Sequence, residues 1–284
     1  MSDDPKTLVS TGWLAQHLKD PDLRVIAASW YLPDTGRDAR AEYEAGHIPG
    51  ARFFDIDEIS DARSDMAHMA PPPEKFMSRM RAMGVGDGHQ VVVYDGHGML
   101  SAPRVWWTFR LMGHRDVAVL DGGFPKWQAE GRAIEDLPPV IKDRHLTARF
   151  QNHLVRDVTQ VSRAAKLGSP QIVDARAAAR FRGDAPEPRE GLRAGHMPGA
   201  RNVPYDTLLN ADKTLKTPDQ TRAIFEAAGV DLAQPIITSC GSGITAAILA
   251  LALERMGHDS WSLYDGSWAE WGMSPMVPVA TGDA

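Results

Sequence analysis

The chain has 284 residues, of which 43% are hydrophobic, and its formal net charge is −6. This length predicts two domains at roughly 150 residues each, with enough apolar side chains for two cores. The net negative charge, with no dense run of lysine and arginine, argues against nucleic acid and anionic membrane surfaces as partners.

In chain order, each half alternates short runs of β-branched residues with segments of helical period. In the first half we expect strands at 24–29, 90–95 and 116–122, with helices at 71–84 and 101–114. In the second half we expect strands at 170–176, 234–240 and 261–266, with helices at 217–229 and 243–258. This alternation predicts an α/β fold in which each half forms a mainly parallel sheet flanked by helices.

The second half repeats the first. The segment AGHIPGARFFDID at 45–57 returns as AGHMPGARNVPYD at 194–206, an offset of 149 positions. Further along, Asp95 matches Cys240 at an offset of 145 (240 minus 95). We therefore expect a tandem duplication, with a first domain at 1–140, a linker at 141–156 and a second domain at 157–284.

Cys240 is the only cysteine, and it follows an expected buried strand and precedes an expected helix. It therefore lies on a loop at the carboxyl end of the sheet, where ligands gather in α/β proteins. Gly241 and Gly243 allow the backbone amides of this loop to curl around one anion, which favours the nucleophilic thiolate. A lone cysteine is otherwise most often a small buried side chain, and the glycines favour the nucleophile. Asp95 cannot accept sulfur, so we expect the first domain to be non-catalytic.

One loop of the second half has no counterpart in the first. Tyr43 matches Phe181 at an offset of 138, whereas Gly46 matches Gly195 at 149, so eleven residues (149 minus 138) are inserted within RGDAPEPREGLR. Polar loops of this kind often carry function. Two nearby arginines, Arg180 and Arg189, could hold a small carboxylate between planar guanidinium groups. The alternative is that one or both form surface salt bridges, which is the role we expect for Arg182 and Arg193.

Taken together, the motifs resemble those of the two-domain rhodanese-type sulfurtransferases, and specifically of the 3-mercaptopyruvate sulfurtransferases. In chain order they are SWYLPD, GHIPGARFFDID, SAPRVWW, LDGGFPKW, RFRGDAPEPREG, GHMPGARNVPY, CGSGIT and YDGSWAEW. The resemblance covers nearly the whole chain. It implies transfer of sulfur from 3-mercaptopyruvate, through a persulfide on Cys240, with release of pyruvate. The implied acceptors are thioredoxin, a small thiol or cyanide, and no cofactor is implied.

The resemblance also implies roles for individual residues. Arg180 and Arg189 match the arginines that hold the mercaptopyruvate carboxylate. Ser242 resembles the serine of a proposed relay whose other members match His68 and Asp57, although His68 could equally belong to a surface loop. The expected catalytic residues are therefore Cys240, Ser242, His68 and Asp57, and the expected substrate-binding residues are Arg180, Arg189, Gly241, Gly243, Ile244 and Thr245.

The charge of the cysteine loop bears on the sulfur donor. Thiosulfate rhodaneses place basic side chains just after the cysteine, which suits a dianion, whereas Gly241, Ser242 and Gly243 leave this loop neutral. We therefore expect 3-mercaptopyruvate as the donor, with a thiosulfate:cyanide sulfurtransferase as the alternative. A non-enzymatic rhodanese-like binding module is a further alternative. A cysteine phosphatase would need an arginine six positions after the cysteine, where Ala246 stands.

The sequence also carries information on location. The first ten residues, MSDDPKTLVS, have the pattern of neither a secretion signal nor a transit peptide. The longest apolar stretch, at 244–253, is well short of the ~20 residues that span a bilayer. A single cysteine permits no internal disulfide, so we expect a cytoplasmic protein without membrane association. The histidines and the cysteine show no zinc-type spacing, so we expect no metal.

Overall fold

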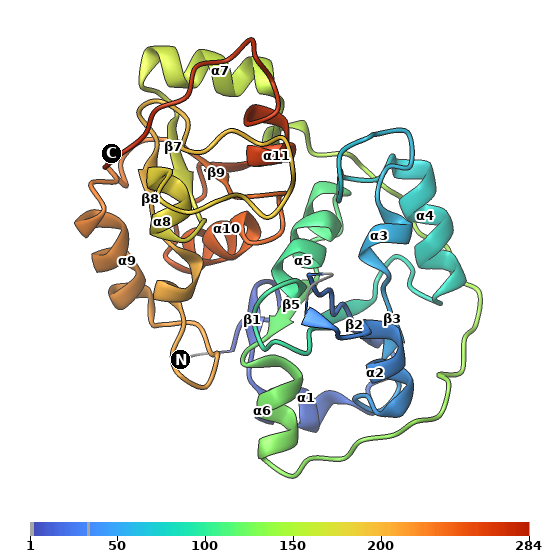
Figure 1. Ribbon diagram of the computed structural model, residues 1–284. Helices are drawn as coiled ribbons and strands as arrows, with labels where there is room; N and C mark the ends of the chain where they lie inside the picture. Colours follow the sequence, from blue (N-terminus) through green and yellow to red (C-terminus); the bar gives the residue numbers. More distant parts are fainter. Residues whose placement is uncertain (1–2, 33–34, 284) are drawn as a thin grey trace. The chain divides into compact units, whose positions relative to one another are not determined.

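The computed structural model describes residues 3–32 and 35–283, which divide into two compact units (Figure 1). Unit 1 comprises Met1–Ala62, Ala70–Gln151 and Asn210–Leu215, and unit 2 comprises Arg63–Met69, Asn152–Leu209 and Lys216–Ala284. Pro33 and Asp34, the last residues of the SWYLPD motif, lie outside the described residues, as do Met1, Ser2 and Ala284.

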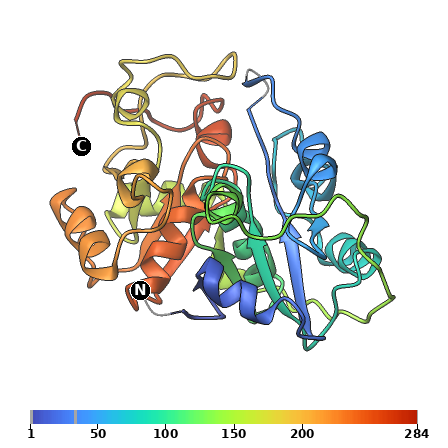
Figure 2. The same cartoon turned by 90° about the horizontal axis from the view of Figure 1, so that it is seen from below.

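Unit 1 is built on a five-stranded parallel sheet with the strand order β1-β5-β4-β2-β3. The strands β2 (blue) and β4 (blue-green) lie side by side (Figure 2), with Val25 opposite Val92. Runs such as QVVVY form central strands because β-branched side chains fill both buried faces of a parallel sheet. The strands are β1 (Leu8–Val9), β2 (Leu23–Ala27), β3 (Arg52–Phe53), β4 (Gln90–Tyr94) and β5 (Val117–Leu120).

The helices of unit 1 flank this sheet, and α5 packs on β4 and β5. Every residue of α5 is buried, from Ala102 to Leu111. Proline stands in the first turn of both α4 and α5, where its missing N–H leaves no helical hydrogen bond unmade. The helices are α1 (Thr11–His17), α2 (Ala39–Ala45), α3 (Ile56–Ile59), α4 (Pro73–Ala82), α5 (Ala102–Leu111) and α6 (Gly123–Ala129).

Unit 2 contains a second five-stranded parallel sheet, with the order β6-β10-β9-β7-β8. Its regular elements are β6 (Val155–Arg156), α7 (Val158–Leu167), β7 (Gln171–Asp174), α8 (Ala178–Arg182), β8 (Arg201–Asn202), α9 (Pro218–Ala227), β9 (Ile236–Ser239), α10 (Ala246–Arg255), β10 (Trp261–Tyr264) and α11 (Ser267–Trp271). Because crossovers between parallel strands are right-handed, helices whose crossovers run in opposite directions along the sheet lie on opposite faces. α7, which leads from β6 to β7, covers one face, and α10, which leads from β9 to β10, covers the other (Figure 1).

The two sheets have the same strand order when β1 to β5 are paired with β6 to β10. The predicted α/β fold and tandem duplication are therefore confirmed, and every expected strand and helix overlaps an observed one. The outer strands β1, β3, β6 and β8 are only two residues long, too short for a sequence period. One of them, β6, lies at the end of the segment 141–156 that was expected to be the linker, and it pairs with β10.

The repeated GH-PGA turns occupy equivalent places in the two units. His47 stacks on Tyr43 and contacts its carbonyl oxygen through Nδ1 at 2.8 Å. His196 stacks on Phe181 and contacts that carbonyl oxygen at 2.9 Å. Both histidines are buried, so these turns hold the helix before each outer strand in place. None of the described helices is long and apolar enough to cross a membrane.

Candidate active site

Cys240 stands directly after β9, at the carboxyl end of a central strand of the second sheet. Its side chain is buried, with 1% of the residue exposed. The first turn of α11 fixes its backbone, because Trp268 donates its N–H to the carbonyl oxygen of Cys240 at 2.9 Å. The Cys240 N–H donates to Oγ of Ser267 at 3.1 Å, and that hydroxyl donates to the carbonyl oxygen of Tyr264 at 2.8 Å. These contacts fix the backbone of Cys240 and do not involve its sulfur.

The loop from Gly241 to Thr245 turns back over the sulfur. Gly243 has a φ of 80°, in the left-handed region that favours glycine, and its N–H donates to Sγ of Cys240 at 3.1 Å. Ile244 is buried and Thr245 half-buried before α10 begins at Ala246. One amide of the loop, that of Gly243, thus contacts the sulfur of Cys240, and the closing of the whole loop around an anion stays a prediction.

The matching loop of unit 1 shows how completely such a cradle can close. The fully buried carboxylate of Asp95 accepts five backbone N–H groups. At Oδ1 the donors are His97 and Gly98, at 2.9 and 2.7 Å. At Oδ2 the donors are Leu100, Ser101 and Ala102, at 2.8, 2.9 and 2.8 Å. An offset of 145 carries these donors onto Ser242, Gly243, Thr245, Ala246 and Ala247 of the cysteine loop.

The bond from Gly98 to Asp95 therefore has its counterpart in the bond from Gly243 to Cys240. Both glycines have a positive φ, 105° and 80° respectively. In unit 1 the cradle is filled by the chain's own carboxylate, which satisfies the loop amides and cannot carry a transferable sulfur. This is consistent with the expectation that Asp95 makes the first loop non-catalytic.

Two members of the expected relay lie together. Nδ1 of His68 is 3.0 Å from Oγ of Ser242, and both residues are largely buried, with 5% and 9% exposed. Sequence position places His68 in the first domain, whereas the contacts of Arg63–Met69 group it with unit 2. Asp57 belongs to unit 1, where its Oδ2 accepts the indole N–H of Trp30 at 3.1 Å. The third member of the relay stays a prediction.

Arg180 lies beside the cysteine loop. A Cβ placed on Gly241 would lie 3.3 Å from Nη2 of Arg180, so only glycine leaves the guanidinium its full space there. Nε and Nη2 of Arg180 both face the carboxylate of Glu187, with the Nε to Oε1 distance 3.3 Å. Glu187 also accepts from Nη1 of Arg176 at 2.8 Å. Sequence reasoning missed this carboxylate, although an acid placed between two candidate arginines was the signal that could have found it.

The other arginines of the inserted loop have distinct surroundings. Arg189 is half-buried and has no hydrogen bond or ion pair among the described residues. Arg182 forms the expected surface ion pair, with Asp184 at 2.7 Å. The prediction of a surface salt bridge for Arg193 was wrong. Its guanidinium instead donates to the carbonyl oxygens of Trp271, Gly272, Ser274 and Val277, because these lie within reach where the chain leaves α11.

Ser267 is a second residue that sequence reasoning missed. It adopts a φ of 49°, which is uncommon for a residue with a side chain. Its counterpart in the first repeat, Gly123 at an offset of 144, has a φ of 55°. A serine kept where the repeat has glycine was the available signal. Its hydroxyl explains the exchange, since it accepts the N–H of Cys240.

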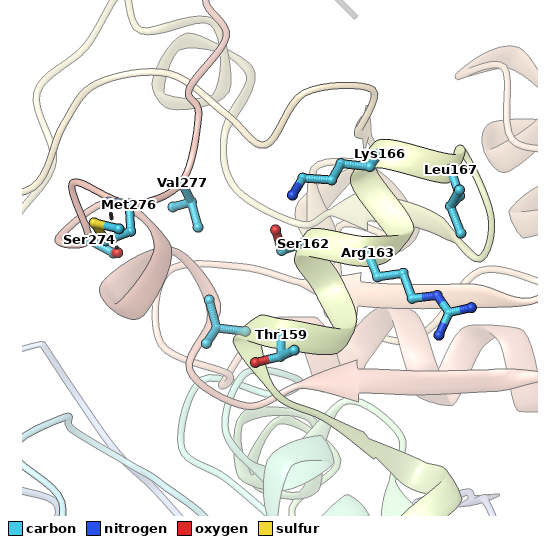
Figure 3. Close-up of a pocket in the computed structure, with 9 residues that line it drawn as sticks. Thr159, Ser162, Arg163, Lys166, Leu167, Ser274, Met276 and Val277 are labelled. Carbon is cyan, nitrogen blue, oxygen red and sulfur yellow. Dashed lines mark hydrogen bonds between the residues drawn. The ribbon is translucent and has the colours of Figure 1, made fainter.

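A groove of about 610 Å³ lies elsewhere in unit 2 (Figure 3). It runs between α7, which contributes Thr159, Ser162, Arg163 and Lys166, and the segment after α11, which contributes Ser274, Met276 and Val277. Cys240 does not line it. The described residues contain no group of three or more His, Cys, Asp or Glu side chains placed to hold a metal ion.

Comparison with known proteins agrees with the geometry. The sequence model of the family described as Rhodanese-like domain matches residues 10–130 and 157–274. The chain is 43% identical over 272 residues to the 3-mercaptopyruvate sulfurtransferase of Escherichia coli (strain K12), covering 95% of this chain and 96% of that protein. It is 42% identical over 273 residues to the thiosulfate sulfurtransferase of Cricetulus griseus, covering 94% and 92%. The crystal structure of SseA from Escherichia coli matches with a TM-score of 0.85 at 42% identity, covering 92% of this chain and 98% of that one.

Proposed function

The chain belongs to the rhodanese-like sulfurtransferases, and on that premise we propose that it is a 3-mercaptopyruvate sulfurtransferase working through a persulfide on Cys240. The observation that carries this proposal is the hydrogen bond from Gly243 to the sulfur of Cys240, in a loop without a basic side chain. The amides that stabilise a thiolate also stabilise the negative charge of a persulfide. A neutral loop suits a donor with one negative charge.

Substrate binding is the first step. Arg189 has no partner among the described residues, so its planar guanidinium is available to take the donor carboxylate through paired hydrogen bonds. Arg180, beside Gly241, assists from the other end of the inserted loop. Holding the carboxylate there places the donor sulfur toward Cys240, and this positioning accounts for part of the rate enhancement.

The thiolate of Cys240 then attacks the sulfur of 3-mercaptopyruvate. A new S–S bond forms while the C–S bond breaks, and the electron pair of the broken bond goes to carbon as the enolate of pyruvate. The enolate takes up one proton, and the persulfide releases the proton that the donor thiol carried, so the half-reaction balances. In this mechanism Ser242 passes the proton, and its contact with His68 supports that role.

The second half-reaction returns the enzyme to its starting state. A thiol acceptor attacks the outer sulfur and leaves the thiolate of Cys240. A dithiol such as thioredoxin releases sulfide, a small thiol becomes a persulfide, and cyanide gives thiocyanate. A reducing compartment such as the cytoplasm is part of this proposal, because it keeps the thiol and dithiol acceptors, and the single cysteine, in the reduced form.

A single-turnover measurement tests the proposed function. Enzyme mixed rapidly with 3-mercaptopyruvate should release about one pyruvate per Cys240 in a burst, followed by a slower phase in which the excess donor itself acts as the thiol acceptor. Cys240→Ser should release none. Continuous pyruvate release by Cys240→Ser would contradict the covalent route. A stoichiometric burst of sulfite from thiosulfate, with no burst of pyruvate from 3-mercaptopyruvate, would favour the thiosulfate:cyanide alternative.

A further inference from the structure

Behind the cysteine loop lies a buried network of two acids and two arginines. The carboxylate of Asp174 accepts from Nε and Nη2 of Arg176, at 3.0 and 2.7 Å to Oδ2. Arg176 donates through Nη1 to Glu187, which in turn accepts from Arg180. The side chains of Asp174, Arg176 and Glu187 are 0 to 1% exposed, and that of Arg180 is 27% exposed. The network thus links a buried strand end to the edge of the cysteine loop.

The formal charges of this network cancel. Burial alone would lower the pKa of Arg176, and the nearby charges of Asp174 and Glu187 more than offset it, so the pKa is raised above its ordinary value. Arg176 therefore stays charged. With two carboxylates against two guanidinium groups, the formal sum is zero, and the charge of Arg180 is already compensated before any substrate arrives. Of the two arginines expected to hold substrate, only Arg189 has no carboxylate beside it among the described residues.

We propose that Glu187 is a specificity-determining residue. By neutralising Arg180, it limits the site to one uncompensated positive charge, which matches donors with one negative charge and disfavours dianions such as thiosulfate. This inference rests on the proposed function and deepens it. Glu187 acts through Arg180 rather than by touching the donor, and its effect is electrostatic, so a buried side chain exerts it without contact.

Glu187→Gln tests the inference, because glutamine keeps the length of the side chain and removes its charge. The ratio of kcat/KM for thiosulfate to kcat/KM for 3-mercaptopyruvate should rise on the order of tenfold. In the variant, the positive charge of Arg180 is no longer neutralised and attracts the second negative charge of thiosulfate at close range. Glu190→Gln is the matched control. It removes the same charge from the same loop, but Glu190 is exposed and has no ion pair among the described residues. Its ratio should stay that of the wild type.

Two further variants separate charge from packing. Glu187→Asp keeps the charge and shortens the side chain, so it should leave the donor ratio unchanged even where it lowers activity with both donors. Asp174→Asn removes the other negative charge of the network, farther from Arg180, and should shift the ratio in the same direction by less. The thermal unfolding midpoint shows whether Glu187→Gln folds. If it does not, Asp174→Asn still tests the inference.

The outcomes are distinct. Equal changes with both donors in Glu187→Gln, or the same ratio shift in Glu187→Asp or Glu190→Gln, would overturn the charge argument and leave Glu187 a packing residue. A wild type that transfers sulfur from 3-mercaptopyruvate, together with unaltered ratios in every folded variant, would refute this inference alone. A wild type that forms no persulfide with either donor would overturn the proposed function and this inference with it.

Discussion

The backbone N–H of Gly243 donates a hydrogen bond to Sγ of Cys240 across 3.1 Å. In the first repeat, the equivalent bond runs from Gly98 to a carboxylate oxygen of Asp95 across 2.7 Å. The same loop thus places a glycine N–H on a carboxylate oxygen in one unit and on a cysteine sulfur in the other. A carboxylate accepts the N–H groups of the loop but cannot carry a transferable sulfur, whereas a cysteine in the same place can accept a second sulfur atom and release it.

Gly243→Ala should lower kcat about tenfold, because alanine at a φ of 80° costs roughly 1–2 kcal/mol and moves the N–H away from the sulfur. Gly257→Ala is the matched control. Gly257 has a φ of 77° and open space around its Cβ position, so the variant carries the same backbone penalty away from the cysteine. Steady-state pyruvate formation checks both. Equal kcat values in the two variants would show that the sulfur contact has no part in turnover.

Arg189→Ala should raise the KM for 3-mercaptopyruvate about tenfold or more, with a smaller effect on kcat, because a charged hydrogen bond to the carboxylate is lost on binding. Arg182→Ala removes an arginine of the same loop that is already paired with Asp184, and its KM should match the wild type. A wild-type KM in Arg189→Ala would show that this guanidinium does not bind the donor carboxylate.

Ser242→Ala and His68→Ala should each lower kcat by about 10²-fold with little change in KM, because the pair handles a proton after the donor has bound. The double variant should be no slower than the slower single one, since two residues that act as a unit are not additive. His258→Ala, on the partly exposed turn after α10, serves as the histidine control. Multiplicative losses in the double variant would show that the two side chains act separately.

Asp95→Asn should lower the free energy of unfolding by about 2 kcal/mol, because an amide nitrogen cannot accept the N–H groups that one carboxylate oxygen accepts. Persulfide formation on Cys240 should persist in the folded variant. Asp20→Asn, on an exposed turn, should leave stability unchanged. Denaturant unfolding measures both, and a stable Asp95→Asn would mean that the loop holds its shape without the carboxylate.

The sequence predicted the elements whose patterns are local. The repeat of AGH-PGAR predicted the duplication, and runs such as QVVVY predicted the central strands. The cysteine loop could be placed because a strand, two glycines and a helix follow one another directly. Two-residue strands such as β6 could not be predicted, because pairing with β10 alone makes them strands.

The burial of the network behind the loop was beyond sequence reasoning, although the position of Glu187 between two candidate arginines was a signal for the pairing. An acid in the polar, proline-rich segment around Glu187 looks solvent-exposed in sequence, and its burial follows only from Arg176, which the end of β7 places beside it. Asp174 and Arg176 are two residues apart after a buried strand, a pattern with many explanations. These pairs join residues 2, 7 and 11 positions apart, but the sequence does not show which of its many nearby opposite charges become buried together.

The central claim is that Cys240 carries the transferred sulfur, and intact-mass spectrometry of the reduced protein tests it most directly. After brief exposure to 3-mercaptopyruvate, the account predicts one added sulfur atom, located on Cys240, with a matching amount of pyruvate, slower loading from thiosulfate, and no addition in Cys240→Ser. No added sulfur from either donor would contradict the account and favour a non-enzymatic binding module.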